Sequence, residues 1–202
     1  MECKLHPYQE YSKNFILDHP YCALLLDMGL GKTLASLTAI DELLNTFEVI
    51  DNVLVIAPLS VAKKTWTDEI AKWDNLNHLT FSKILEKPQE RIAALHKKAD
   101  VYLINRENVE WLVEYFGHSW PFKTVIIDEL SSFKSSKAKR FKALRKVRPR
   151  MDRVVGLTGT PSPNRLMDLW SQIYLLDQGE RLGKRSQAIA TNTLSLIKKM
   201  AI

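Results

Sequence analysis

The residues from Leu26 to Thr33 have the composition of a loop that binds phosphate groups. The stretch reads Leu-Asp-Met-Gly-Leu-Gly-Lys-Thr and follows the apolar residues Ala23, Leu24 and Leu25. Its glycines allow backbone conformations in which successive N–H groups point at an anion, and its lysine adds a positive charge. The threonine hydroxyl is placed to reach a magnesium ion. The predicted nucleotide contacts are Met28, Gly29, Leu30, Gly31, Lys32 and Thr33.

The match to the phosphate-loop pattern is incomplete. The pattern has a glycine five residues before Gly31, and this chain has Leu26 there. On these residues alone, a glycine turn with a solvated lysine is the alternative. A magnesium-binding carboxylate further along the chain would favour the nucleotide site.

Such a carboxylate follows a second apolar run, because Thr124-Val125-Ile126-Ile127 leads directly into Asp128-Glu129. Transfer of a phosphoryl group to water needs a phosphate cradle, a divalent metal ion and a group that orients the attacking water. We assign the cradle to Lys32, the magnesium contacts to Thr33 and Asp128, and the water to Glu129. Lys32, Asp128 and Glu129 are thus the predicted catalytic residues of a nucleotide hydrolase.

The segments around these motifs alternate between strand and helix patterns. Apolar runs at 53–57, 101–104, 124–127 and 154–157 are typical of buried parallel strands, whose carboxyl ends share one ligand-binding edge. Apolar residues recur at helical spacing in 34–44, 66–73, 138–147 and 166–173. Ser60 is expected to cap the helix containing Trp66 and Trp73, two side chains that we place in the core. The predicted fold class is α/β, an open, mostly parallel sheet with helices on both faces.

The net charge of +6 is concentrated in one segment. Residues 131–150 hold nine basic side chains and no acidic one, so the remainder of the chain is net negative. A local basic face suggests a polyanion partner, with Lys137, Lys139 and Arg140 as candidate DNA contacts. The alternative is a solvated helix face, which is the commoner origin of a basic run.

The lengths of the apolar runs indicate where in the cell the protein is expected. None approaches the roughly 18 residues that span a bilayer, and the N-terminal residues do not form a signal peptide. We therefore expect a cytoplasmic protein with no membrane partner.

Five motifs in this order resemble those of Swi/Snf-type ATPases in helicase superfamily two, whose first lobe is RecA-like. They are the Q motif at 5–11, motif I at 27–33, motif Ia at 57–60 with two following tryptophans, motif II at 128–131 and motif III at 157–164. Residues 128–134 and 177–183 are similar in particular to phage and prophage members, which implies a bacterial host cell. The resemblance implies an ATPase that is stimulated by double-stranded DNA, translocates along it and uses ATP and Mg²⁺.

The resemblance also implies roles for single residues. Gln9 would contact the adenine, since an amide donates and accepts hydrogen bonds at once. Thr158 and Thr160 would couple hydrolysis to movement of the lobes. The residues near the DNA backbone would be Pro58, Ser60, Asn105 and Arg106.

Motif II departs from the family's usual Asp-Glu-Ala/Gly-His. Leu130 and Ser131 take its last two positions, so the metal and base positions are kept and the histidine is absent.

Residues 1–183 are predicted to form the ATP-binding lobe, and 184–202 a short tail of uncertain structure. The family's second lobe, with motifs IV to VI and its arginine fingers, would begin after about Gly183, and the tail is too short to form it. Arginine fingers are worth roughly a thousandfold or more in rate. We expect an ATP hydrolase that is weak or inactive alone and needs a second lobe from another chain.

Two other interpretations stay open. The chain would be a truncated remnant that binds ATP or DNA with little catalysis, or a nucleotide-dependent partner of a nuclease or other phage protein. Steep salt dependence of duplex binding would favour a direct DNA contact by the basic run.

Overall fold

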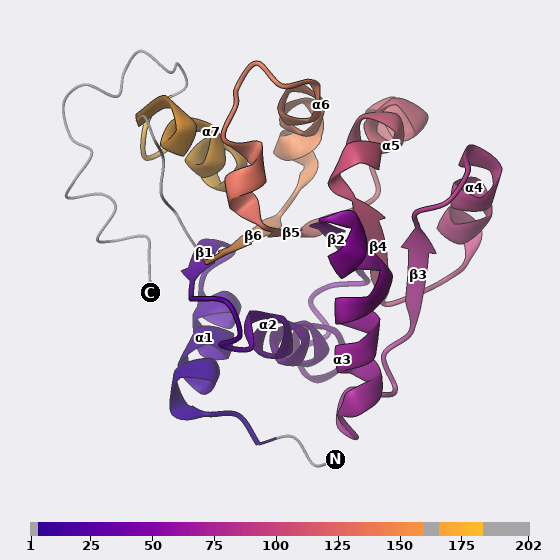
Figure 1. Cartoon of the computed structure of the whole chain (residues 1–202), viewed down its shortest axis with the longest axis vertical. Coiled ribbons are helices and arrows are strands. Elements are labelled where there is room, and N and C mark those ends of the chain that lie inside the picture. Colours follow the sequence, from indigo (N-terminus) through magenta and orange to yellow (C-terminus); the bar gives the residue numbers. More distant parts are fainter. Residues whose placement is uncertain (1–3, 160–165, 184–202) are drawn as a thin grey trace.

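The protein is built on one open sheet of six parallel strands. The computed structural model describes residues 4–159 and 166–183. The strands lie in the order β1-β6-β5-β2-β4-β3, and every neighbouring pair is parallel (Figure 1). Their bounds are β1 (Tyr21–Leu25), β2 (Val53–Ala57), β3 (Phe81–Ile84), β4 (Val101–Asn105), β5 (Thr124–Asp128) and β6 (Arg153–Thr158).

Helices cover both faces of this sheet. One face carries α1 (Pro7–Asp18), α2 (Lys32–Asp41) and α3 (Trp66–Lys72). The other face carries α4 (Pro88–His96), α5 (Val109–Phe116), α6 (Lys139–Val147) and α7 (Leu166–Asp177) (Figure 1). Within residues 4–159 and 166–183, no helix combines the length and apolar character needed to cross a bilayer.

The alternation of side chains along each strand produces two cores. In β2, Val53, Val55 and Ala57 pack under α1 to α3, whereas Leu54 and Ile56 pack under the other helices. Successive side chains of a strand point to opposite faces, so an unbroken apolar run fits a sheet that is covered on both sides. The predicted α/β class and open parallel sheet are confirmed.

Two local predictions fail. Ser60 does not cap a helix, because its backbone is already helical (φ −63°, ψ −38°) and its side chain makes no capping hydrogen bond. The chain enters α3 through a π-helical turn at Val61–Thr65. Helix α5 was not predicted, although its Val109, Leu112 and Val113 are buried.

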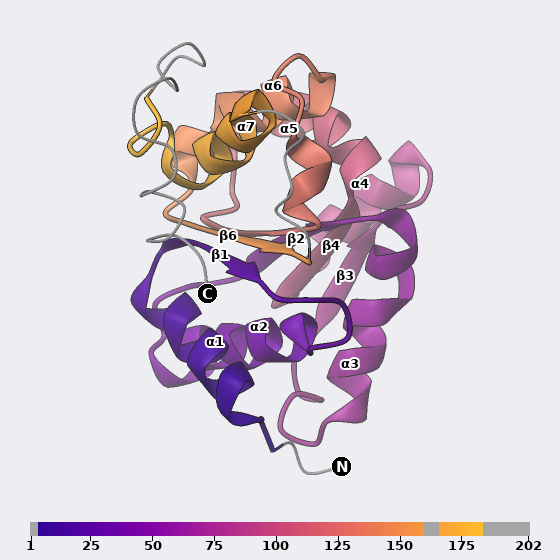
Figure 2. The ribbon, with the colours of Figure 1, turned by 60° about the vertical axis from the view of Figure 1, so that its left-hand side comes forward.

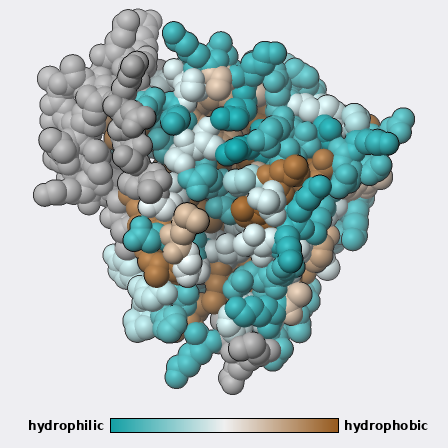
Figure 3. All heavy atoms as spheres, viewed as in Figure 1, coloured by the Kyte–Doolittle hydropathy of each residue, from teal (hydrophilic) through white to brown (hydrophobic). Residues whose placement is uncertain are grey.

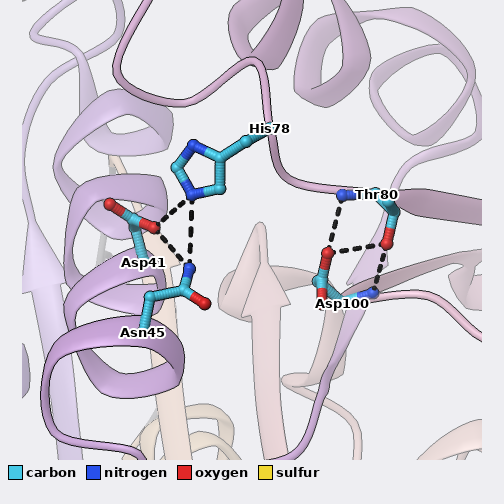
Figure 4. A network of polar contacts seen from close by, with 5 residues as sticks. All are labelled: Asp41, Asn45, His78, Thr80 and Asp100. Carbon is cyan, nitrogen blue, oxygen red and sulfur yellow. Dashed lines mark hydrogen bonds and ion pairs between the residues drawn. The ribbon is translucent and has the colours of Figure 1, made fainter.

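Polar side chains fix the connection that leads into the edge strand β3 (Figure 4). His78 Nε2 lies 2.8 Å from Asp41 Oδ1 at the end of α2, and Asn45 Nδ2 donates to the same oxygen at 2.7 Å. Thr80 donates through its N–H to Asp100 Oδ2 at 2.7 Å and accepts from the Asp100 N–H at 3.0 Å. The segment before β3 is thus held to both α2 and the start of β4.

Arg148 lies inside the protein instead of on the predicted basic face. Its guanidinium donates to the carbonyls of Leu175 and Leu176 in the last turn of α7 and to the Met151 carbonyl. It also lies 4.7 Å from the centre of the Tyr21 ring. Carbonyls in the last turn of a helix have no partner within the helix, and a cation there also suits the helix dipole. Arg148 therefore secures the end of α7 against β1.

We predict that Arg148→Met lowers the free energy of unfolding by about 2–5 kcal/mol, because buried carbonyls lose their donor. Urea unfolding followed by tryptophan fluorescence measures this change. Lys146→Met, at an exposed position of α6, is the control. A loss no larger than that of the control would show that the buried guanidinium is not a structural tie.

Candidate nucleotide-binding site

The predicted phosphate loop joins the end of β1 to the first residue of α2 (Figure 2). Gly29 (φ 83°) and Gly31 (φ 72°) both occupy the left-handed region that favours glycine. Helix α2 begins at Lys32, so its unpaired N–H groups and the positive end of its dipole face the loop. The local geometry is that of an anion-binding turn.

Lys32 makes its contacts within this loop. Its Nζ donates to the carbonyl of Leu26 at 2.6 Å and to that of Asp27 at 3.0 Å. Position 26 is where the full motif has glycine, and here its backbone oxygen is a ligand of the lysine. The ammonium group has three N–H donors, so a phosphate group that accepts more than one hydrogen bond from it must replace at least one of these carbonyls.

Gln9 packs directly against the phosphate loop. Its side chain is buried, with Nε2 donating to the Leu30 carbonyl at 3.3 Å and Oε1 accepting from the His6 N–H at 2.9 Å. A Cβ atom added at Gly31 would lie 2.2 Å from Gln9 Nε2. Gly31 is therefore required by both its backbone angle and the close approach of Gln9.

Asp128 ends β5 and is largely buried. Its Oδ2 accepts a 2.9 Å hydrogen bond from the indole N–H of Trp66, which is itself fully buried. Burial raises the pKa of the Asp128 carboxyl, and the charge of Glu129 acts in the same direction. The Trp66 hydrogen bond and the charge of Lys32 oppose this rise. Lys32 is thus near enough for its charge to act on the pKa of the Asp128 carboxyl.

Glu129 has a positive φ angle, and hydrogen bonds fix the position of its carboxylate. Its φ is 62°, in the left-handed region. Its Oε1 accepts hydrogen bonds from the hydroxyl of Thr158, at 3.2 Å, and from the hydroxyl of Ser131. Motifs II and III therefore meet at this oxygen, and Ser131, one of the two departures in motif II, contacts the predicted base directly.

Leu130, the other departure in motif II, is accommodated by a glycine in β6. Leu130 is buried, and a Cβ atom added at Gly156 would lie 2.5 Å from its Cδ2. Gly159, directly after β6, lies beside the phosphate loop, where an added Cβ would be in ordinary van der Waals contact with the Met28 N atom at 3.5 Å. Strand β6 thus touches both motif I and motif II.

A pocket of about 420 Å³ lies beside the phosphate loop, which is within the size range of about 300–1,000 Å³ that is usual for small-molecule sites. Its lining comes from the N-terminal segment and α1, from the loop and start of α2, and from the region of α3. The residues are Lys4, His6, Gln9, Gly29, Gly31, Lys32, Thr33, Leu34, Thr65, Glu69, Lys72 and Trp73.

The sequence and structure together match one family. A profile of the SNF2-related domain matches residues 9–187, which is most of the chain. The chain belongs to the SNF2-related domain family.

Individual relatives agree with this assignment. Protein p41 of Acyrthosiphon pisum secondary endosymbiont phage 1 is 43% identical over 95% of this chain. The mouse DNA excision repair protein ERCC-6-like is 30% identical over 78% of it. The Sulfolobus solfataricus SWI2/SNF2 ATPase core, solved in complex with double-stranded DNA, superposes with a TM-score of 0.80 and 28% identity over the whole chain.

The chain spans less than half the length of these proteins. It covers 43% of p41, 13% of the mouse protein and 41% of the solved ATPase core.

Most DNA-contact candidates of this SNF2-related domain follow neighbouring strands. Pro58 and Ser60 follow β2, and Asn105 and Arg106 lie at the end of β4, where Ala57 pairs with Asn105. Glu107 accepts hydrogen bonds from Asn105 Nδ2 at 3.0 Å and from Arg106 Nε at 2.8 Å.

The environment of the Glu107 carboxylate favours its charged form. Partial burial acts to raise the pKa of Glu107, but the hydrogen bonds from Arg106 and Asn105 outweigh it and lower the pKa.

The basic DNA-contact candidates in and beside α6 differ in exposure and in hydrogen bonding. Lys137 and Lys139 are exposed. Arg140 instead donates through Nη2 to the Ser132 carbonyl at 2.8 Å, and its guanidinium lies 5.8 Å from the centre of the Phe133 ring. Arg140 therefore holds the segment after motif II, and its role as a DNA contact stays a prediction.

Sequence reasoning missed two features of the site. Trp66 is in the core as predicted, but its hydrogen bond to Asp128 joins residues 62 positions apart and leaves no local signal. Trp73 is only half-buried and lines the pocket, so it is not purely a core residue. Thr160 lies outside the described residues.

Exposed apolar residues follow two of the strands, and the metal-ligating residue types of the described segments are dispersed. Met28, Leu30 and Leu59 are exposed in the segments that follow β1 and β2. Figure 3 shows apolar residues among hydrophilic ones on the face seen in Figure 1. Among the residues described, His, Cys, Asp and Glu side chains do not gather in threes as a protein-only metal site would require.

We predict that Asp128→Asn stabilises the protein without nucleotide at pH 7. The folded-state pKa of Asp128 is raised, so ionisation of the wild-type carboxyl costs stability as the pH rises through that pKa. Asparagine avoids this cost and still accepts from Trp66. The gain should be on the order of 1 kcal/mol, or roughly 2–4 °C in Tm.

Thermal unfolding between pH 4 and pH 8 checks this expectation. The gain should shrink toward pH 4, where the wild-type carboxyl becomes protonated. Asp152→Asn, at an exposed position, is the control. A gain that does not change with pH would exclude the ionisation of Asp128 as its cause.

We predict that Gly156→Ala lowers the free energy of unfolding by about 1–3 kcal/mol, because the new methyl group overlaps the buried Leu130 side chain. Leu130→Ala in the same chain removes the overlap. Urea unfolding of both single variants and the double variant gives their coupling. If the losses in unfolding free energy of the two single variants add up to that of the double variant, the contact between Leu130 and Gly156 is not the cause.

Proposed function

We propose that this chain is the ATP-binding motor lobe of a DNA-dependent ATPase of the helicase-like, translocating kind. The observation that carries the proposal is the meeting of three motifs at the carboxyl ends of the adjacent strands β1, β6 and β5. Lys32 acts electrostatically on Asp128, and Glu129 accepts a hydrogen bond from Thr158. These residue types in this arrangement supply a phosphate cradle, a metal-binding carboxylate and a water-orienting base.

The phosphate loop has defined tasks in this proposal. The N–H groups of residues 28–31 and the start of α2 receive the phosphates, and Lys32 leaves the carbonyls of Leu26 and Asp27 to contact them. Gln9 lies against the loop with an amide that can still offer one N–H and one lone pair to the adenine.

The oxygen donors of the site suit Mg²⁺. Thr33 offers a hydroxyl and Asp128 a carboxylate, and Mg²⁺ is usually held by one or two such protein groups together with substrate phosphates. When bound, the ion would neutralise charge on the phosphates. Glu129 orients the attacking water, and the hydroxyls of Thr158 and Ser131 fix the direction of its carboxylate.

Full hydrolysis requires groups beyond this lobe. The chain corresponds to 41% of the solved SWI2/SNF2 ATPase core, which leaves room in that protein for a second lobe. Arginine fingers supply about 10³–10⁵ in rate. We propose that a second lobe supplied by another chain completes the reaction and that Thr158 and Thr160 couple hydrolysis to movement of the lobes.

Double-stranded DNA is the proposed polymer partner. The similar Sulfolobus solfataricus core was solved in complex with it. The candidates Pro58, Ser60, Asn105 and Arg106 continue the edge that carries the nucleotide motifs, next to β5. Because p41 comes from a phage, we place the protein in the cytoplasm of a bacterial host.

The second candidate function is an ATP- or DNA-binding module with little catalysis. In this alternative the lobe binds its ligands without turnover. A nuclease that responds to the nucleotide state would be its partner.

We predict that Lys32→Ala weakens ATP binding by roughly 10- to 100-fold, the worth of a charge-assisted hydrogen bond. Isothermal titration calorimetry with Mg²⁺ measures the affinity. Lys123→Ala, an exposed position before β5, is the control. Unchanged affinity in Lys32→Ala would remove the phosphate-loop assignment. DNA-stimulated turnover of several per second by the chain alone would contradict the need for a second lobe.

The DNA partner is tested with Lys137→Glu/Lys139→Glu. Loss of phosphate contacts should weaken duplex binding and flatten its dependence on salt, measured by fluorescence anisotropy. The control is Lys97→Glu/Lys98→Glu, which changes the same charge at exposed positions between α4 and β4. Equal effects of the two pairs would show that only the overall charge matters.

A further inference from the structure

We propose that the last turn of α3 and the residue after it form the nucleoside end of the pocket. The base lies against the indole of Trp73, and Glu69 accepts hydrogen bonds from the ribose hydroxyls. This proposal rests on the proposed function, because it assumes that the phosphate loop holds the phosphates of the same ligand.

The lining of the pocket determines the direction of the ligand. One end consists of Gly29, Gly31, Lys32 and Thr33, where α2 begins and negative charge is favoured. The remaining walls are the α3 region, with Glu69 and Trp73, and the segment around Gln9. A nucleoside triphosphate whose phosphates occupy the first end must extend its nucleoside between these two walls.

Trp73 is shaped for a stacking contact. Its side chain is half-buried against the core beneath α3, and its Nε1 donates to Glu69 Oε1 at 2.7 Å, which fixes the plane of the ring. Lys72 Nζ lies 4.4 Å from the ring centre, so one face of the indole is reached from the solvent side. The lysine side chain is exposed, and a planar base can take its place on that face.

Glu69 is the polar group that matches the sugar. Its hydrogen bond to Trp73 uses Oε1, and within residues 4–159 and 166–183 no group donates a hydrogen bond to Oε2. A carboxylate only accepts hydrogen bonds, so Oε2 suits a hydroxyl donor and disfavours a phosphate. Lys4, Lys32 and Lys72 line the same pocket and balance its charge.

The test compares ATP with inorganic tripolyphosphate by isothermal titration calorimetry. Trp73→Ala should weaken ATP binding about tenfold, the effect of losing one stacked base, and leave tripolyphosphate binding unchanged. Trp73→Phe should keep most of the affinity for ATP. The matched control is Trp111→Ala, which removes a half-buried tryptophan from α5 on the opposite face of the sheet.

Glu69→Gln tests the ribose contact. The amide oxygen can still accept from Trp73, whereas the amide nitrogen that replaces Oε2 cannot accept from a hydroxyl. Wild-type protein should bind ATP several-fold more tightly than 2′,3′-dideoxy-ATP, and Glu69→Gln should reduce this preference, because a neutral amide N–H replaces the charged acceptor. A preference of unchanged size in the variant overturns the role of Glu69.

The outcomes separate this proposal from the proposed function. If Lys32→Ala weakens both ligands and Trp73→Ala weakens neither, the phosphate loop is correct and the nucleoside subsite is wrong. If Trp73→Ala weakens both ligands equally, the tryptophan supports the fold and not the base. If the wild-type chain binds neither ligand, the ATP-binding function itself fails and the subsite with it.

Discussion

The hydrogen bond from the Trp66 indole to the Asp128 carboxylate is the contact on which the site depends. A carboxylate that leaves water costs several kcal/mol unless charges and hydrogen bonds compensate it. Here one indole N–H and the charge of Lys32 compensate only in part, so the pKa stays raised. The bond joins α3 to the end of β5. The same helix carries Glu69, so Asp128 and the wall of the pocket formed by α3 are positioned together.

The elements of this fold were largely readable from the sequence. Runs such as Val53–Ala57 are apolar without interruption, which only a strand covered on both faces requires, and the strand forms with those bounds. The Asp128-Glu129 pair could be assigned to the carboxyl end of a strand because it directly follows such an apolar run. Contacts between segments that are distant in the chain could not be predicted from the sequence. Arg148 looked like part of a basic surface, since nothing in its neighbourhood indicates that the carbonyls at the end of α7 surround it.

Motif II shows how a departure from a family pattern can be absorbed elsewhere. Leu130 is larger than the usual residue, and Gly156 leaves the space that it fills. Ser131 cannot reach as far as a histidine, yet its hydroxyl bonds to Glu129 within the same motif. Both adjustments are confined to the ends of β5 and β6 and the residues that follow β5. A pattern match alone would have recorded two mismatches where the structure shows two fitted contacts.

The contacts of Lys32 have a thermodynamic consequence for every ligand of the loop. Because the ammonium group already binds two carbonyl oxygens of its own chain, the loop contains an internal competitor for phosphate. The measured affinity is then the intrinsic affinity multiplied by the fraction of molecules in which the lysine has been released. Any contact that draws the carbonyls of Leu26 and Asp27 away would raise nucleotide affinity without touching the nucleotide. The backbone carbonyls of residues 26 and 27 thus supply a means of tuning ligand affinity.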